Sequence, residues 1–259
     1  MDFKDYKDVV HIIRDISFSL KKNHCLGIVG ESGSGKSITC RAILGLLGKN
    51  FNIEGDAFFE GINLLKADKR RIRRIRGKEV SMILQNPMTS FDPLYSIENQ
   101  MIETLVENLG ISISEAKPLC LKAVEEMNII NPKVVLKKYP HELSGGMLQR
   151  VMIGIALTLK PQIIIADEPT TAVDSANQIK VLKEFANIKE KYHTSMIFIS
   201  HDLGAISKVA DDIIVMKDGR IVEQGTAKEI LNSPKNHHTK YLIDTRKSLV
   251  DRFNYIINK

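Results

Sequence analysis

Short, uninterrupted runs of apolar residues recur along the chain, and most of them stop at a glycine or a polar residue. Runs of this kind are typical of strands that are buried on both faces of a sheet. They occur at residues 26–29, 162–166, 195–200 and 212–216. Apolar residues at helical spacing occupy residues 37–47, after the first run. Strands that alternate with helices predict an α/β fold with a mainly parallel sheet covered on both faces.

The last apolar run leads into a predicted hairpin. Residues 217–222 place Asp218 and Gly219 between apolar segments, and an Asp-Gly pair in this position favours a tight two-residue turn. The sheet is therefore expected to include an antiparallel β part.

The pattern changes between Gln85 and about Met152, where no strand pattern occurs. Residues 96–109 and 115–128 have the spacing of amphipathic helices. We interpret this stretch as an α-helical subdomain inserted into the α/β core, so that residues 1–259 form a single domain. Its expected parts are an α/β core at residues 1–86 and 151–225, a helical subdomain at 87–150, and a polar, basic C-terminal extension at 226–259.

The composition is that of a soluble globular protein, with 43% hydrophobic and 26% charged residues. No apolar run approaches the roughly 20 residues that a membrane-crossing helix needs. The N-terminal residues lack the apolar core of a signal peptide, so we expect the chain in the cytoplasm. Cys25, Cys40 and Cys120 are far apart and are expected to be buried, reduced thiols.

The net charge of +6 raises the question of an anionic partner. Much of this charge lies in one run, residues 69–78. A solvated helix face explains such a run more often than a binding patch does. Aromatic residues make up 6% of the chain and tryptophan is absent, so base stacking has little support and no nucleic-acid partner is expected.

A glycine-rich segment follows the first apolar run and opens the helical stretch. It reads Gly30, Glu31, Ser32, Gly33, Ser34, Gly35, Lys36 and Ser37, which is a complete GxxxxGK[ST] P-loop. Small residues let backbone N–H groups surround phosphates at a helix N-terminus. Lys36 is expected to reach the β- and γ-phosphates of ATP, and the Ser37 hydroxyl is expected to bind Mg²⁺. The motif predicts a P-loop NTPase (RecA-like) core.

The apolar run at residues 163–166 ends in two carboxylates, Asp167 and Glu168. The carboxyl end of a parallel strand lies at the crevice where ligands bind. Asp167 is placed to hold Mg²⁺, and Glu168 is placed to polarise the water that attacks the γ-phosphate. Alone the pattern is weak, because many strands end in a solvated acid; together with the P-loop it is strong.

The segment LSGGMLQR at residues 143–150 makes the chain resemble the ATP-binding-cassette (ABC) ATPases. The resemblance implies that Ser144, Gly145 and Gly146 present their polar groups to the γ-phosphate of ATP held by a second subunit. A serine-capped helix start is the structural interpretation of the same residues, and both can hold.

Other elements of the family follow in order. Gln85 matches the Q-loop glutamine, which the resemblance implies as a Mg²⁺ ligand and as the link to a membrane partner. Residues 171–174 resemble the D-loop, and His201 matches the switch histidine that contacts the γ-phosphate. The expected catalytic residues are then Glu168, His201, Gln85 and Lys36, and the expected Mg²⁺ ligands are Ser37, Gln85 and Asp167.

The resemblance is thinnest at the N-terminus, where the strand that precedes the P-loop in this family looks short or missing. The family also places an aromatic ring there, against adenine. Phe3 and Tyr6 are the candidates, and neither lies in a clear motif.

Residues 86–94, NPMTSFDPL, resemble the peptide/nickel branch of bacterial importers, as do residues 75–83, 142–147 and 239–242. Within this branch, the leucine at position 148 resembles the nickel and metallophore members more than the oligopeptide members. The branch implies uptake of nickel, a metal–metallophore complex or short peptides. It also implies a second ATPase subunit, two transmembrane permease subunits, an extracellular or periplasmic solute-binding protein, and a place on the cytoplasmic face of the membrane.

Two alternatives belong to other functional classes. An ABC-type ATPase acting on nucleic acid or ribosomes commonly joins two cassettes or carries a long coiled coil, and residues 37–143 hold no sustained heptads. A non-hydrolysing regulatory subunit is indicated by loss of Glu168 or His201, and both are present. His237 and His238 are expected to be exposed on a polar tail without a metal role.

Overall fold

The structure is a computed structural model, and it describes residues 1–5, 8–170 and 175–245. The chain divides into two compact units, one formed by Met1–Ala67 with Ile197–Lys259 and the other by Asp68–Met196. We describe each unit by itself.

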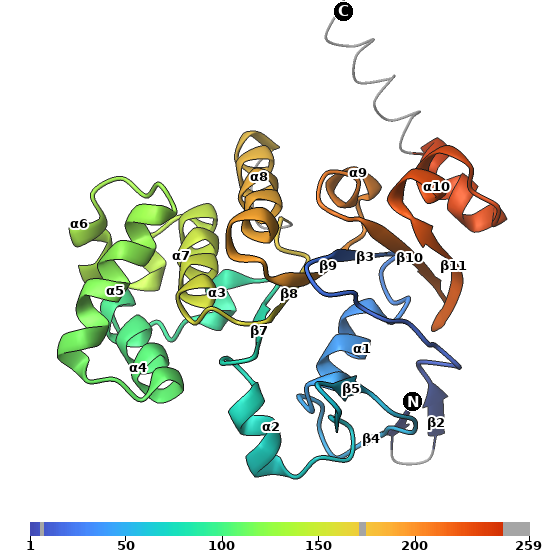
Figure 1. Ribbon diagram of the computed structural model, residues 1–259, viewed down its shortest axis with the longest axis horizontal. Coiled ribbons are helices and arrows are strands. Elements are labelled where there is room, and N and C mark those ends of the chain that lie inside the picture. Colours follow the sequence, from blue (N-terminus) through green and yellow to red (C-terminus); the bar gives the residue numbers. More distant parts are fainter. Residues whose placement is uncertain (6–7, 171–174, 246–259) are drawn as a thin grey trace, which may run out of the picture. The chain divides into compact units, whose positions relative to one another are not determined.

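Parallel strands form the centre of the first unit (Figure 1). In it β3 (Cys25–Val29) pairs in parallel with β10 (Asp212–Lys217), so that Ile28 lies opposite Ile214. On its other side β3 neighbours β9 (Ser195–Ser200), and β11 (Arg220–Thr226) pairs antiparallel with β10. All five residues of β3 are buried. The predicted strands and the mainly parallel sheet with an antiparallel part are confirmed.

The turn between β10 and β11 has the predicted hairpin geometry. Asp218 has φ 49° and Gly219 has φ 74°, and left-handed conformations at both central positions are what a type I′ turn requires. The Gly219 N–H donates to the Ser34 carbonyl at 3.2 Å, and the Arg14 N–H donates to the Gly219 carbonyl at 2.8 Å. The hairpin therefore supports the P-loop directly.

The N-terminal segment contains a small antiparallel sheet of order β2-β1-β4. Its strands are β1 (Asp2–Asp5), β2 (Asp8–His11) and β4 (Phe51–Asn52). The strand that was expected to be short or missing is present and is short, with four residues. A second hairpin joins β5 (Phe58–Phe59) and β6 (Ile62–Asn63).

Helices of the first unit are α1 (Lys36–Ile43), α9 (Leu203–Ile206) and α10 (Ala227–Asn232), and residues 237–245 are also helical. The helix predicted over residues 37–47 ends early at Ile43, because Gly45 adopts φ 59° and its N–H bonds to the Ala42 carbonyl.

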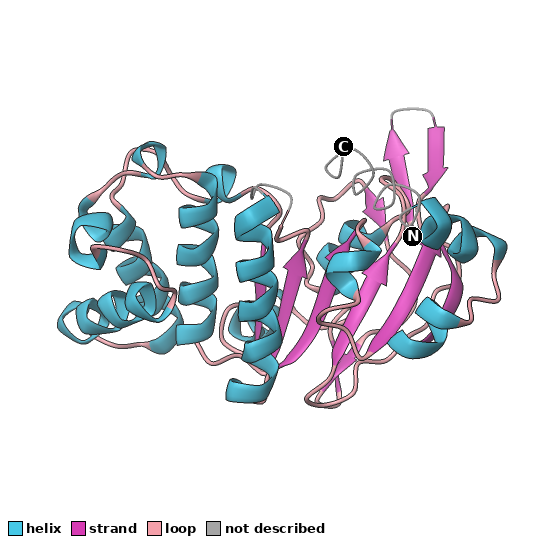
Figure 2. Ribbon diagram, turned by 90° about the horizontal axis from the view of Figure 1, so that it is seen from above, coloured by secondary structure: helices cyan, strands magenta, loops and turns pink. Residues whose placement is uncertain are grey.

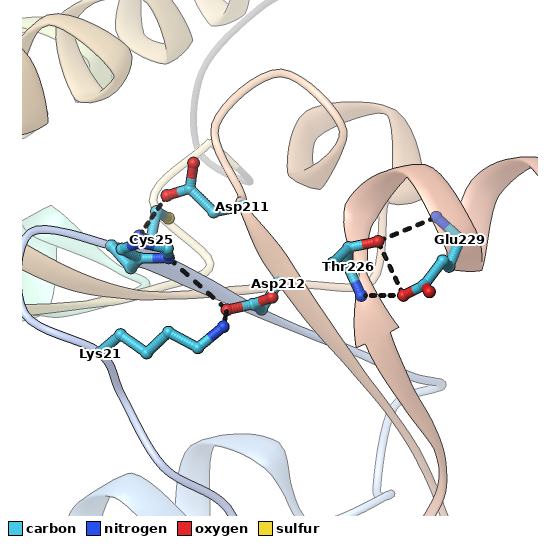
Figure 3. A network of polar contacts seen from close by, with 7 residues as sticks. Lys21, Cys25, Asp211, Asp212, Thr226 and Glu229 are labelled. Atoms are coloured by element: carbon cyan, nitrogen blue, oxygen red, sulfur yellow. Dashed lines mark hydrogen bonds and ion pairs between the residues drawn. The ribbon is translucent and has the colours of Figure 1, made fainter.

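Two neighbouring acids anchor the start of β10 (Figure 3). Asp211 accepts the Cys25 N–H at 2.8 Å and Asp212 accepts the Lys21 ammonium at 2.8 Å. At the far end of β11, the Thr226 hydroxyl and the Glu229 carboxylate form a capping box for α10. The P-loop strand and its neighbour are thus fixed to each other at their starts.

The second unit pairs β7 (Val80–Ile83) with β8 (Ile163–Asp167) in parallel. Between these strands the described chain contains only helices, seen together in Figures 1 and 2. They are α3 (Pro87–Ser90), α4 (Ile97–Leu109), α5 (Ile113–Glu126), α6 (Pro132–Lys137), the 3₁₀ helix η1 (Pro140–Glu142) and α7 (Gly145–Thr158). The unit also contains α2 (Lys69–Ile75) and α8 (Ser175–Tyr192).

Close packing and side-chain caps define the helices of the second unit. A Cβ on Gly154 of α7 would lie 2.9 Å from the Ala123 carbonyl of α5, so only glycine permits this approach. Ser96 caps α4, whose bounds agree with the helix predicted over residues 96–109 to within one residue. The helix predicted from Glu115 begins at Ile113 instead, because Ser112 and Glu115 form a capping box.

Several composition-based expectations have structural counterparts. Cys25, Cys40 and Cys120 are buried thiols that form no disulfide within the described part of the chain, and burial raises the pKa of the Cys120 thiol to about 11. Among the helices that the structure describes, none is both long and apolar enough to cross a membrane. His238 departs from expectation because only 8% of it is exposed; its ring stacks on that of Tyr241.

Candidate nucleotide-binding and catalytic site

The P-loop connects the buried strand β3 to α1 in a backbone conformation that depends on glycine. Gly33 has φ 82° and Gly35, the residue that precedes α1, has φ 101°, and side chains rarely tolerate such values. At Gly30 a Cβ would collide with the Met216 carbonyl of β10 and lie 2.7 Å from the Ser34 hydroxyl. At Gly35 it would collide with the Ile13 side chain. The loop is therefore tightly held from two sides.

Polar groups of this loop are arranged for an anion. Lys36 is 4% exposed, and its ammonium donates to the carbonyls of Gly30 and Glu31, both at 2.8 Å. The Ser34 hydroxyl is buried and has no hydrogen-bond partner. A buried cation at a helix N-terminus beside an unpaired hydroxyl fits a phosphate group. Glu31, Ser32 and Gly33 are exposed and Ser37 is half-buried.

Two predicted residues meet at the ends of the paired strands in the second unit. Ile83 lies opposite Ala166 in the register of β7 and β8, so Gln85 and Glu168 each come two residues later. The Gln85 amide donates to the Glu168 carboxylate at 3.1 Å. Asp167, the last residue of β8, is fully buried. The structure thus brings Gln85 and Glu168 together, as the parallel arrangement predicts.

Glu168 has an unusual backbone conformation, with φ 46°. This left-handed region is costly for residues other than glycine, and such conformations gather at functional sites. Glu168 is half-buried, so part of it is accessible to water. These properties suit a group that orients a water molecule.

The signature segment forms the start of α7. The Ser144 hydroxyl accepts the Met147 N–H at 3.3 Å and caps the helix. The next residues, Gly145 and Gly146, occupy the first turn, whose N–H groups have no acceptor within the helix. They are half-buried and Ser144 is exposed. The structural interpretation of this serine is confirmed, and the geometry also presents free donors at a positive helix end.

His201 follows β9 directly and its side chain is exposed in the first unit. Asp202 then caps α9 through its carboxylate, which accepts the Gly204 N–H at 2.6 Å. The predicted D-loop, residues 171–174, lies outside the described residues, as does Tyr6. The Phe3 ring lies 5.0 Å from that of Phe51; its role toward adenine stays a prediction.

The sequence motif did not reveal the residues that shape the P-loop from outside it. These are Ile13, Met216 and Gly219, which contribute a side chain, a carbonyl and an N–H group. The one sequence signal for them is the Asp-Gly pair that follows the strand of Met216. This pair predicts a hairpin turn, but it does not predict that the turn lies against the P-loop.

A family model described as "ABC transporter" matches residues 13–171. The chain belongs to the ABC transporter family. As an ABC ATPase, this cassette binds and hydrolyses ATP. The matched range includes the P-loop, Gln85, the signature segment and both carboxylates.

Curated relatives of this cassette are named as ATP-binding proteins of import or transport systems. The metal-staphylopine import system ATP-binding protein CntD of Staphylococcus aureus strain NCTC 8325 is 43% identical over 246 residues, covering 95% of this chain and 91% of that protein. The dipeptide transport ATP-binding protein DppD of Lactococcus lactis is 44% identical, covering 97% of this chain and 74% of that protein. The oligopeptide transport ATP-binding protein OppD of Bacillus subtilis is 41% identical, covering 96% and 70%.

A solved structure supports the fold. The ATP-binding cassette MJ0796, in a dimeric post-hydrolysis state bound to ADP and Pi, matches with a TM-score of 0.78 and 24% sequence identity. The match covers 87% of this chain and 95% of that one. At this identity the likeness establishes the cassette fold.

Proposed function

We propose that this cassette is the ATP-hydrolysing subunit of an importer, and that its ATP hydrolysis drives uptake of a metal–metallophore complex or short peptides. The observation that carries the hydrolytic part is the contact of Gln85 with Glu168 at the ends of β7 and β8. A regulatory subunit that only binds ATP does not require this pair.

The P-loop holds the phosphates of ATP. In the proposed complex the γ-phosphate displaces the carbonyls of Gly30 and Glu31 from the Lys36 ammonium. The unpaired Ser34 hydroxyl gains an acceptor at the same time. The change at Ser34 is favourable because a buried donor without a partner is costly, and the change at Lys36 replaces neutral carbonyl acceptors by a charged one, which binds an ammonium more strongly.

Hydrolysis requires a water molecule in line with the γ-phosphate. Glu168 accepts a proton from that water, and Gln85 and His201 orient the water and the γ-phosphate. The hydroxyl of Ser37, the amide oxygen of Gln85 and the carboxylate of Asp167 are oxygen donors of the kind that Mg²⁺ prefers. Bound Mg²⁺ would neutralise charge on the phosphates.

A second ATPase subunit completes each site. Ser144, Gly145 and Gly146 present N–H donors at the start of α7, and we propose that they contact the γ-phosphate of ATP bound by the partner. The dimeric state of MJ0796 in its solved structure supports such a pairing. Closing and reopening of this ATP-bound dimer moves two permease subunits. The cassette acts on them at the cytoplasmic face of the membrane. A solute-binding protein delivers the solute on the other side.

The names of the relatives support the class of solute. CntD is named for metal-staphylopine import and DppD for dipeptide transport. The CntD comparison covers most of both chains. This agrees with the prediction from Leu148 that the cassette belongs with the metallophore importers. None of the relatives reported above is named for nucleic acid or ribosomes.

The proposal is tested by measuring ATP turnover in the cassette co-expressed with its permease and ATPase partners. Glu168→Gln is expected to retain ATP binding and to lose turnover by about 100-fold or more, in line with removal of a general base. Ser144→Arg is expected to reduce ATP turnover of the complex strongly, because a bulky side chain then occupies the γ-phosphate position. Unchanged turnover in Glu168→Gln would show that this chain is a regulatory partner.

A further inference from the structure

The positive charge of the chain is concentrated in one segment that the proposed reaction does not use. Seven of the 37 lysine and arginine residues fall within positions 69–78. They are Lys69, Arg70, Arg71, Arg73, Arg74, Arg76 and Lys78. Without these seven, the chain would have 30 basic residues against 31 acidic ones. The segment therefore accounts for the whole positive excess.

Helix α2 presents these cations on one continuous surface. Ile72 and Ile75 are 6% and 4% exposed and fix the buried side of the helix. At 100° per residue the other positions of α2 cover an arc of about 200°. Lys69, Arg70, Arg71, Arg73 and Arg74 all lie on this arc and all are exposed, as is Lys78 beyond the helix. We call these six side chains the cationic surface.

The cationic surface is part of ordered structure and is not a loose tail. Asp68 caps α2 by accepting the Arg71 N–H at 2.8 Å. After the helix, Gly77 adopts φ 77° and its N–H bonds to the Val80 carbonyl at 2.9 Å. A Cβ on Gly77 would collide with the Asn108 side chain of α4. The helix is thus fixed at both ends.

Neighbouring acids do little to balance these charges. Arg73 lies 3.7 Å from Glu107, and both side chains are largely exposed, so the pair is weak. Within the part of the chain that the structure describes, the side chains of Lys69, Arg70, Arg71 and Arg74 make no hydrogen bond or ion pair. Cations in the first turn also oppose the helix dipole, and cations three or four residues apart repel each other. An external anion would relieve both effects.

We propose that the cationic surface binds the phosphate headgroups of anionic lipids. This inference rests on the proposed function, which places the cassette at a membrane. Guanidinium groups pair with phosphate through two parallel hydrogen bonds. The exposed arc of α2 has no apolar residue, so the contact is electrostatic and the helix stays on the membrane surface. Residues 69–78 also contain no aromatic side chain that could stack on a base, which disfavours single-stranded nucleic acid.

The test is flotation of the purified full-length chain with lipid vesicles, in the absence of ATP. Vesicles of phosphatidylcholine are compared with vesicles of phosphatidylcholine and phosphatidylglycerol, and single-stranded RNA is titrated in parallel. The variant carries Arg70→Gln, Arg71→Gln, Arg73→Gln and Arg74→Gln. A control that loses the same charge from exposed lysines of α5 and α6 carries Lys117→Gln, Lys122→Gln, Lys133→Gln and Lys137→Gln.

Selective binding to the anionic vesicles is expected, and it should weaken as salt is raised. The α2 variant is expected to lose at least about tenfold in apparent affinity, while the control keeps most of it. Equal binding to both kinds of vesicle, an equal loss in both variants, or tighter binding to RNA would overturn the proposal. Thermal melting checks that both variants are folded. ATP turnover of the co-expressed complex tests the proposed function separately, because vesicle binding needs no hydrolysis.

Discussion

At Gly30 the structure leaves room for a hydrogen atom and nothing larger. A Cβ there would collide with the carbonyl of Met216 in the neighbouring strand. Gly48 provides a contrast, because no atom lies within 4 Å of the Cβ position and its backbone has no positive φ. Two glycines on either side of α1 thus have opposite tolerance for the same substitution.

We predict that Gly30→Ala lowers the free energy of unfolding by about 1–3 kcal/mol, the usual cost of overpacking, and weakens ATP binding. Gly48→Ala should change stability by less than about 0.5 kcal/mol. Denaturant unfolding and fluorescent-nucleotide titration measure the two effects. Equal stability of the two variants would show that the loop can shift away from β10.

The core strands could be predicted because each is an uninterrupted apolar run that no helical spacing of apolar residues obscures. The run at 195–200 matches β9 residue for residue, and the run at 26–29 matches β3 to within one residue. The sequence left open whether the N-terminal strand is short or missing because the pattern there is weak: Val9 and Val10, which neighbour each other in β2, are both more than half exposed. Burial of His238 was missed because the segment around it is polar.

The candidate site was predictable where a short motif determines local geometry. The P-loop and the cap of α7 follow from their own residues. The contact between Gln85 and Glu168 follows from parallel pairing of the strands that precede them. The closeness of Met216 to Gly30 depends on strand order, and no local pattern carries that information.

Ser144 caps α7 and, in the proposed mechanism, contacts the γ-phosphate of the partner's ATP, and one substitution can separate these two roles. Aspartate is as good a helix cap as serine, so we predict that Ser144→Asp retains the stability of α7. Its negative charge would repel the γ-phosphate of the partner's ATP, and turnover should fall by about 100-fold or more. Ser144→Ala should instead lose about 1 kcal/mol of stability with a smaller effect on turnover. Thermal melting and phosphate release distinguish these results; normal turnover in Ser144→Asp would place the serine away from nucleotide.

The cap of α5 predicts a dependence of stability on pH. Hydrogen bonds from the hydroxyl and the backbone N–H of Ser112 hold the pKa of Glu115 below its usual value of 4.5. A lowered pKa in the folded state adds stability that is fully present above about pH 4.5 and is lost as the pH falls through the folded pKa. Glu115→Gln should therefore lower Tm near pH 7, and this effect should shrink as the pH is lowered progressively below 4.5.

Glu125 is the control for this experiment, since it is exposed on the same helix and lies outside the cap. Glu125→Gln should not lower Tm at pH 7. If Glu115→Gln changed Tm equally at all pH values, the contribution of Glu115 to stability would come from its shape and not from its charge.

The whole molecule is expected to change its state of association with ATP. We predict that the Glu168→Gln chain forms a dimer when ATP is present and a monomer when it is absent, as measured by light scattering after size exclusion. Adding Ser144→Arg to that chain should keep it monomeric. If the Glu168→Gln chain stays monomeric with ATP but dimerises with a second ATPase of the same importer, the working pair is a heterodimer.

The collision at Gly30 also has a genetic consequence. Second-site suppressors usually make space by shortening a neighbouring side chain, but the obstacle here is a carbonyl group, which every residue at position 216 would carry. A selection for restored growth after Gly30→Ala should therefore yield reversion at codon 30 and no rescue from codon 216. In this part of the cassette, the backbone of β10 limits which substitutions in the P-loop can be tolerated or suppressed.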